Sequence, residues 1–304
     1  MPVTASSRDA FAACEQLAAS HYENFSVLSW FLPRALRPHF SSVYAFCRST
    51  DDLGDEGSAT TDERLARLDA WETDLRRCFC QHETPEHPYL TALRETIQAY
   101  HLPPEPFLRL IEANRMDQRQ QRYPTYADLL CYCEHSANPV GQLVLMLYGY
   151  RDSERQRCSD AICTALQLTN FWQDIPSDYH ERHRVYLPQE DMARFGVSES
   201  ELALGKATPA FRSLLAFEVE RARVFFHEGW PLLKSLPALP RRAVALFALG
   251  GLEVLAALER IGYDVFTQRP TLSRRRKAAL MAQVLLFSPT ATKRRWHGDG
   301  NGRC

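Results

Sequence analysis

The sequence predicts a single all-α domain, and three observations support this fold class. Apolar residues recur with the i, i+3, i+4 spacing of amphipathic helices along nearly the whole chain, and no run shows the period-two alternation of a strand. Only 13 of the 304 residues are glycine, which fits a chain with few tight β-turns. No Asn-Gly hairpin signal lies between apolar runs. We therefore expect a bundle of helices.

The expected helices follow one another closely along the chain. Thr125 followed by Asp128 resembles a capping box, which marks one helix start. Pro139 and Pro176 should kink or break the helices that contain them, because proline lacks an N–H and clashes with the preceding turn. Residues 188–207 are predicted to form a loop with one short helix. The helices are expected at 8–19, 22–31, 36–56, 61–80, 88–100, 104–121, 126–149, 154–180, 209–234, 239–265 and 272–287.

Composition sets the class of protein. Apolar residues make up 45% of the chain and charged residues 24%, which excludes a disordered chain, a collagen and a coiled-coil rod. The net charge of −1 gives no indication of a nucleic-acid partner. Neither a secretory signal nor an apolar run of about 20 residues is found, so we expect a cytoplasmic protein. Residues 1–290 should form the domain and residues 291–304 a flexible polar tail.

The C-terminal segment is basic. From Arg269 to Cys304 the only acid is Asp299, among nine lysines and arginines. The segment around 273–287 is interpreted as a last helix that packs on the domain with a basic face toward solvent. A helix that rests on the inner face of a membrane is the alternative, and it would make the protein peripheral to that membrane.

A first acidic motif lies near the end of the helix expected at 36–56. Asp51 and Asp55 are four residues apart and therefore share one helix face, and Asp52 and Glu56 form a second such pair. Like charges at this spacing destabilise an isolated helix, and a cation would remove that cost. Carboxylates are suitable ligands for Mg²⁺. The alternative is an acidic helix end that faces solvent.

A second polar stripe lies on the helix expected at 154–180. Asn170, Asp174 and Asp178 follow at i, i+4 and i+8 and drift by about 40° per step, so all three share one face. Gln167 extends the same stripe. Apolar residues between 166 and 172 flank it, which indicates a largely buried helix whose polar stripe needs a compensating charge. A polar face that merely meets water is the alternative.

Two acidic stripes that face each other across a helical bundle could hold a Mg²⁺–diphosphate cluster. The competing chemistry of helical bundles is a carboxylate-bridged di-iron site, which requires Glu-x-x-His on two helices. That pattern occurs nowhere in the sequence. The metal–diphosphate interpretation is therefore favoured.

Each of four further residues has two possible roles. Arg48 could bind a phosphate oxygen or form a surface ion pair with Asp52. Tyr44 and Tyr132 could present a hydroxyl or ring to an apolar pocket, or could be core aromatics with a satisfied hydroxyl. His21 could be a ligand or base, or could stand at a capped helix start.

Together these motifs resemble the squalene/phytoene synthase family of head-to-head prenyl synthases, from about residue 15 to residue 270. Within this family the chain looks most like the hydroxysqualene synthase branch of bacterial hopanoid biosynthesis, on the segments 21–27, 136–141 and 170–174. The residues that match the family motifs are Tyr44, Cys47, Arg48, Asp51, Asp52, Asp55, Tyr132, Ala137, Val140, Gly141, Gln167, Asn170, Asp174, Asp178, Arg184, Tyr186 and Pro188.

The resemblance implies an isoprenoid-synthase-type helical bundle around a central cavity. It also implies Mg²⁺, or Mn²⁺ in its place, as cofactor. The implied metal ligands are Asp51, Asp55, Asn170, Asp174 and Asp178. The implied catalytic residues are these five together with Tyr44, Arg48 and Tyr132. The implied substrate-binding residues are His21, Phe25, Arg48, Asn138, Gln167, Arg184 and Tyr186.

The activity implied by the resemblance is conversion of presqualene diphosphate and water to hydroxysqualene and diphosphate. Head-to-head condensation of two prenyl diphosphates is the first alternative, and a non-catalytic helical assembly protein on the same fold is the second. No Gly-x-Gly-x-x-Gly fingerprint is present, so NADPH is not expected. A prenyl diphosphate is the expected partner, and other enzymes of the pathway are further candidates.

Overall fold

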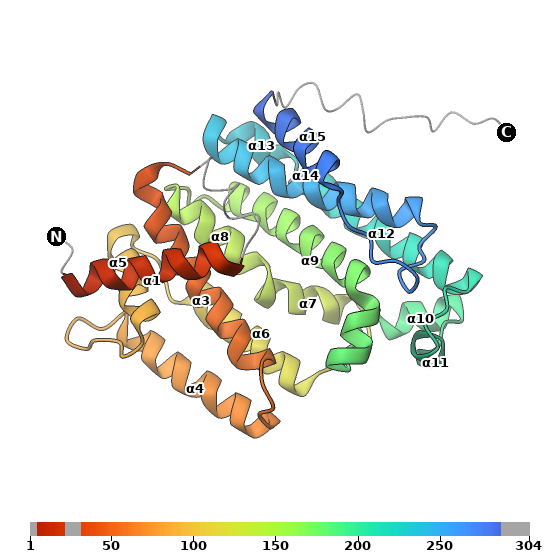
Figure 1. Cartoon of the computed structure of the whole chain (residues 1–304), viewed down its shortest axis with the longest axis horizontal. Helices are drawn as coiled ribbons and strands as arrows, with labels where there is room; N and C mark the ends of the chain where they lie inside the picture. Colours follow the sequence, from red (N-terminus) through yellow and green to blue (C-terminus); the bar gives the residue numbers. More distant parts are fainter. Residues whose placement is uncertain (1–4, 22–31, 287–304) are drawn as a thin grey trace.

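A computed structural model describes the protein over residues 5–21 and 32–286, where every regular element is a helix (Figure 1). This confirms the all-α fold class. The elements are α1 (Ala5–His21), η1 (Arg34–Leu36), α3 (Arg37–Asp55), α4 (Thr61–Arg77), α5 (Pro88–Tyr100), α6 (Glu105–Arg119), α7 (Tyr126–Ser136), α8 (Asn138–Leu147), α9 (Ser153–Arg182), α10 (Gln189–Phe195), α11 (Glu199–Ala203), α12 (Pro209–Gly229), α13 (Pro231–Ser235), α14 (Ala238–Arg260) and α15 (Arg274–Leu285).

The two internal prolines behave differently. The helix expected at 126–149 is divided at Ala137, where α7 ends and α8 begins with Pro139 in its first turn, as expected. In contrast, α9 runs through Pro176 without a break. Trp172 and Ile175 on the preceding turn are buried, and their packing holds the helix together where one backbone hydrogen bond is missing. The Thr125–Asp128 capping box is present.

Other boundaries differ from the sequence prediction. The expected helix 209–234 ends at Gly229, and α13 restarts at Pro231, a residue suited to a first helical turn. The expected helix 239–265 ends at Arg260, before a turn with positive φ at Gly262 and Tyr263. The region 188–207 holds two short helices instead of one. The helix expected at 22–31 and the tail at 291–304 lie outside the described residues.

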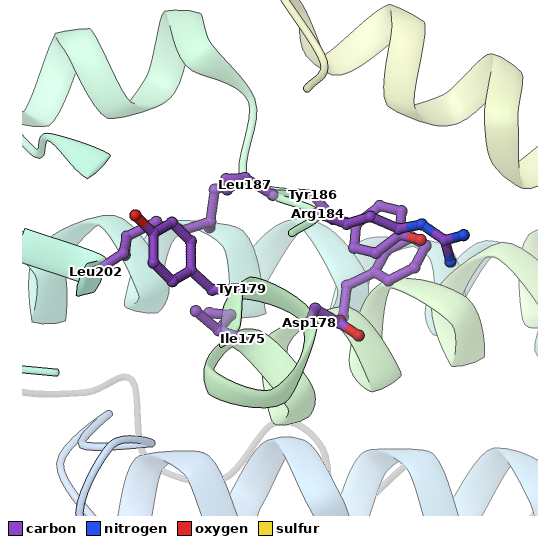
Figure 2. A pocket seen from close by; sticks show the side chains of 9 residues that line it. Ile175, Asp178, Tyr179, Arg184, Tyr186, Leu187 and Leu202 are labelled. Atoms are coloured by element: carbon purple, nitrogen blue, oxygen red, sulfur yellow. The ribbon is translucent and has the colours of Figure 1, made fainter. Parts of the chain in front are cut away.

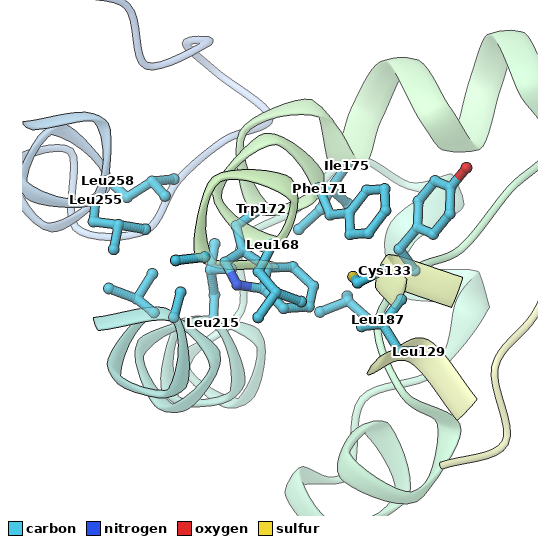
Figure 3. Close-up of a cluster of buried hydrophobic side chains, with 14 of the residues drawn as sticks. Leu129, Cys133, Leu168, Phe171, Trp172, Ile175, Leu187, Leu215, Leu255 and Leu258 are labelled. Atoms are coloured by element: carbon cyan, nitrogen blue, oxygen red, sulfur yellow. The ribbon is translucent and has the colours of Figure 1, made fainter. Parts of the chain in front are cut away.

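Helix α9 is the centre of the bundle, with α7, α8, α12 and α14 packed around it (Figure 1). Figure 3 shows α9 side chains, with fully buried Trp172 among them, interdigitating with leucines of α12 and α14. Burial of each such side chain contributes about 1.5–3 kcal/mol. Among the described helices, none combines the length and apolarity that a membrane crossing requires.

Gly250 and Gly251 on α14 are adjacent but have different surroundings. A Cβ on Gly251 would lie 2.5 Å from Phe226 Cζ and 2.8 Å from Leu166 Cδ2, whereas a Cβ on Gly250 would have no atom within 4 Å. We expect Gly251→Ala to lower the free energy of unfolding by about 1–3 kcal/mol, because the buried ring cannot move aside. Gly250→Ala should raise it by about 0.5–1 kcal/mol. Urea denaturation measures both, and equal stability of the two variants would contradict this packing.

A buried charge cluster joins α10 to α12. Arg221 Nη1 lies 2.6 Å from Asp191 Oδ2 and 3.5 Å from Glu218 Oε1, and the Glu218 side chain has no exposed surface. Burial and the neighbouring Asp191 carboxylate raise the pKa of Glu218 to about 8, against the partial compensation of Arg221. The folded protein holds the proton on the Glu218 carboxyl more tightly than the unfolded chain does. Protonation of Glu218 therefore adds to the free energy of unfolding, and this contribution is complete at low pH. It is lost as the pH rises toward 8.

We therefore expect Glu218→Gln to flatten the pH dependence of stability. Between pH 6 and pH 9 the wild-type free energy of unfolding should fall by roughly 2 kcal/mol more than that of the variant. Guanidinium denaturation at several pH values measures the difference. Glu220→Gln, at an exposed position of the same helix, is the matched control and should follow the wild type. Parallel curves for Glu218→Gln and wild type would show that Glu218 is already ionised at pH 6.

Candidate active site

A cavity of about 390 Å³ lies between α3, α8, α9 and α14. Its wall is mostly apolar, with Phe40, Val43, Val144, Ile162, Val244 and Phe247 among the lining residues. Polar side chains enter the wall where α3 and α9 approach their acidic motifs: Tyr44 and Cys47 on α3, and Gln167 and Asn170 on α9. On both helices the first aspartate of the motif follows one turn later. The cavity therefore has an apolar body and a polar end, and we call this polar end, together with the aspartates that follow one turn beyond it, the acidic end.

The two acidic helices meet at this end through arginines. Arg182 lies 3.0 Å from Asp178 Oδ1 on α9 and 3.9 Å from Asp55 Oδ2 on α3. Arg184, which is nearly buried, lies 2.8 Å from Asp55 Oδ1 and 3.5 Å from Asp117 Oδ2. One guanidinium thus contacts a carboxylate from each predicted stripe, so the stripes face each other.

Asp174 has its own arginine. Arg269 Nε and Nη2 donate to its two carboxylate oxygens at 2.6 and 3.1 Å, and the neighbouring Gln173 donates to the Pro270 carbonyl. Within residues 5–21 and 32–286, no three His, Cys, Asp or Glu side chains are already arranged to hold a metal ion. Arginines hold the positions that a cation would take at Asp55, Asp174 and Asp178.

The environment of the acids opposes their ionisation. Asp51 is reached by solvent but has protein atoms on most sides, and this desolvation raises its pKa to about 6, although the Asn114 amide donates to it at 3.2 Å. Desolvation likewise raises the pKa of Asp178 to about 6, against the Arg182 charge, with Asp174 adding repulsion. A bound cation would stabilise the ionised form of both acids.

Helix α6 supplies a polar layer behind α3 that sequence reasoning missed. Asn114 bonds to Asp51, and Gln118 Nε2 donates to the Gly54 carbonyl at 3.0 Å. The helices approach closely here, since a Cβ on Gly54 would lie 2.4 Å from Asn114 Oδ1. A signal was present in the sequence. Phe107, Leu110 and Ile111 set a helical period whose next core positions are 114, 117 and 118, which are all polar.

Asp117 connects this layer to two predicted tyrosines. Tyr132 donates to Asp117 Oδ2 at 2.8 Å and Tyr186 to Asp117 Oδ1 at 3.3 Å. Desolvation raises the Asp117 pKa to about 6, partly offset by Arg184. The ring of Tyr186 stacks on Phe171 with centroids 3.8 Å apart, beside the small pocket that Figure 2 shows with Arg184 and Asp178. Tyr132 is therefore a core aromatic with a satisfied hydroxyl, one of its two predicted readings.

The remaining predicted residues are placed as follows. Arg48 lies 2.6 Å from both Asp52 and Glu56. It therefore forms the ion pair with Asp52 that was one of its two predicted roles. Asn138 is buried behind the cavity wall and accepts a hydrogen bond from Thr164 at 3.0 Å.

His21 is the last residue of α1 and not at a helix start, so that detail of the sequence prediction is corrected. The side chain of His21 and the whole of Phe25 lie outside the described residues.

Comparisons with known proteins agree with this architecture. The family model for squalene/phytoene synthase matches residues 18–276. The 15-cis-phytoene synthase of Synechococcus elongatus is 32% identical over 294 residues, which cover 93% of this chain and 94% of the relative.

Two solved structures have the same fold. The crystal structure of squalene synthase HpnC from Alicyclobacillus acidocaldarius is 49% identical with a TM-score of 0.80, and the match covers 86% of this chain and 97% of that one. A dehydrosqualene synthase solved with a ligand is 28% identical with a TM-score of 0.82, covering 92% and 96%. Since the family model spans most of the chain and the acidic helices and cavity are in place, the protein belongs to the squalene/phytoene synthase family, whose members act on prenyl diphosphates.

Proposed function

We propose that the protein is a hydroxysqualene synthase, which converts presqualene diphosphate and water to hydroxysqualene and diphosphate. The observation that carries the proposal is the cavity with an apolar body and an acidic end, which suits a long hydrocarbon with a diphosphate head. The choice within the family is supported by the 49% identity to the HpnC structure, against about 30% for phytoene synthases.

The acidic end fits Mg²⁺. The available donors are the carboxylates of Asp51, Asp55, Asp174 and Asp178 with the Asn170 amide, an all-oxygen set of the kind Mg²⁺ takes together with phosphate oxygens. Desolvation raises the pKa of Asp51 and of Asp178, and a bound cation would offset this cost by stabilising their ionised forms. When bound, Mg²⁺ would supply positive charge that stabilises the leaving diphosphate.

The reaction places distinct demands on the chain. The C–O bond to diphosphate breaks and its electron pair leaves with the phosphate oxygen. The exposed guanidinium groups of Arg182 and Arg269, beside Asp178 and Asp174, are placed to bind the released negative charge. The cyclopropylcarbinyl cation that remains rearranges in the apolar cavity, where the wall excludes bulk water. The ring of Tyr44, which lines the cavity, is placed to stabilise positive charge. One water then adds to the cation and releases a proton.

Turnover is the direct test. We expect hydroxysqualene when the purified protein is incubated with Mg²⁺ and presqualene diphosphate, and no condensation product from farnesyl diphosphate, with products identified by gas chromatography and mass spectrometry. Asp51→Asn should reduce the rate at least about 100-fold, because one charge at the diphosphate site is lost. Asp62→Asn, at an exposed position of α4, should retain the wild-type rate.

Other products would change the proposal in defined ways. Presqualene diphosphate or phytoene formed from simple prenyl diphosphates would favour the condensing enzymes, which the names of the curated relatives support. No product from any of these substrates would favour the non-catalytic alternative. Full activity of Asp51→Asn would remove the aspartate from the metal site.

Asp117 has a positioning role in this proposal. The Arg184 guanidinium is nearly buried and has two carboxylate partners, Asp55 and Asp117. If Asp55 is to bind a cation, Arg184 must keep another anion, because an unpaired buried charge costs several kcal/mol. Asp117, held by the hydroxyls of Tyr132 and Tyr186, provides it.

We expect Asp117→Asn to raise the Mg²⁺ concentration needed for half-maximal activity by roughly tenfold, because Arg184 would then compete with the cation for Asp55. Titration of activity with Mg²⁺ measures this shift, and thermal denaturation confirms folding. Glu112→Gln on the same helix, at a half-exposed ion pair, is the matched control and should leave the Mg²⁺ requirement unchanged. A lower maximal rate with an unchanged Mg²⁺ requirement would argue against the competition.

A further inference from the structure

The outer side of α15 is apolar although it faces away from the protein. Leu280 and Val284 are buried against the core, so the opposite side of the helix faces away from the protein. On that side Ala278, Ala279, Ala282 and Leu286 are all exposed, and Leu286 reaches 86% exposure. Both sides of this helix are therefore apolar, and only one is covered within the part of the chain that the structure describes.

This surface continues onto α14. Arg242 Nη2 donates to the Leu285 carbonyl at 3.1 Å, which brings the start of α14 to the end of α15. Leu239, one turn before Arg242, is 43% exposed and Leu285 is 47% exposed. Figure 1 shows α15 at the outer edge of the molecule beside α14. Six large aliphatic side chains are exposed among the described residues, and three of them gather here. We call Leu239, Ala278, Ala279, Ala282, Leu285 and Leu286 the α15 outer face.

The charged side chains that α15 itself carries are all basic. Arg274 and Arg275 are exposed at the start of α15, and no acid occurs between 269 and 286. Arg276 is excluded from this group because it pairs with Glu253 at 2.6 Å. An exposed apolar face flanked by cations complements an anionic lipid surface. A second copy of the chain would bring its own cations against these, since a twofold contact pairs the same surface with itself.

The α15 outer face and the cavity share helix α14. Ala243, Val244 and Phe247 line the apolar body from the turns of α14 that directly follow Leu239 and Arg242. We propose that the α15 outer face docks on the surface of an anionic lipid bilayer, with the apolar end of the cavity toward the lipid. This goes beyond the proposed reaction, and vesicle binding is measured without turnover.

The test is flotation of the full-length protein with lipid vesicles. We expect binding to vesicles of phosphatidylcholine mixed with phosphatidylglycerol, weaker binding at high salt, and little binding to phosphatidylcholine alone. Leu286→Glu should reduce the affinity for the anionic vesicles by roughly tenfold through loss of apolar contact and added repulsion. Arg275→Glu should reduce it by a similar factor through reversal of one charge near the surface.

Matched controls separate this face from non-specific adhesion. Leu204→Glu replaces another exposed leucine, on the far segment after α11, and Arg67→Glu reverses an exposed charge on α4. Both should bind anionic vesicles like the wild type. The proposal is overturned if the wild type does not bind these vesicles, or if the α15 variants bind as well as the controls. A dimer in lipid-free solution that Leu286→Glu dissociates would also overturn it and assign the face to a second copy.

Discussion

Repulsion between carboxylates that α3 and α9 carry toward each other is the constraint on which the site depends. Asp55 and Asp178 both contact Arg182, so negative charges from two helices share one small volume. Such an arrangement is stable only with cations among the acids. In the structure these cations are the guanidinium groups of Arg182, Arg184 and Arg269.

The surrounding helices are arranged to make that compensation possible. Arg184 lies within the protein between Asp55 and Asp117, and Asp117 in turn accepts hydrogen bonds from two tyrosines of the core. Removal of any one partner would leave a buried polar group unsatisfied, so the network fixes α3, α6, α7 and the segment that follows α9 relative to one another. The polar interior behind α3 is thus a structural requirement of the acidic site in front of it.

The sequence predicted the helical class, an interruption of the helix at Pro139 and the two acidic stripes, because these depend on local periodicity and on proline. It did not predict the partner of each acid. Arg269 meets Asp174 across 95 residues, and Asp117 meets Arg184 across 67, and such distant pairings are set by the packing of helices and not by spacing along the chain. Asp117 was detectable only as a polar residue at a position where the period of α6 requires an apolar one.

The cavity joins two environments with opposite requirements. At its acidic end charges must be kept compensated, and along α8 and α14 the proposed reaction requires an apolar wall that keeps bulk water away from the cation. A hydrocarbon substrate is poorly soluble in water, and direct transfer from a lipid phase would avoid exposure of its chains. Since α14 contributes to both the cavity wall and the α15 outer face, the helix that encloses the hydrocarbon also stands at the surface from which such a substrate would arrive.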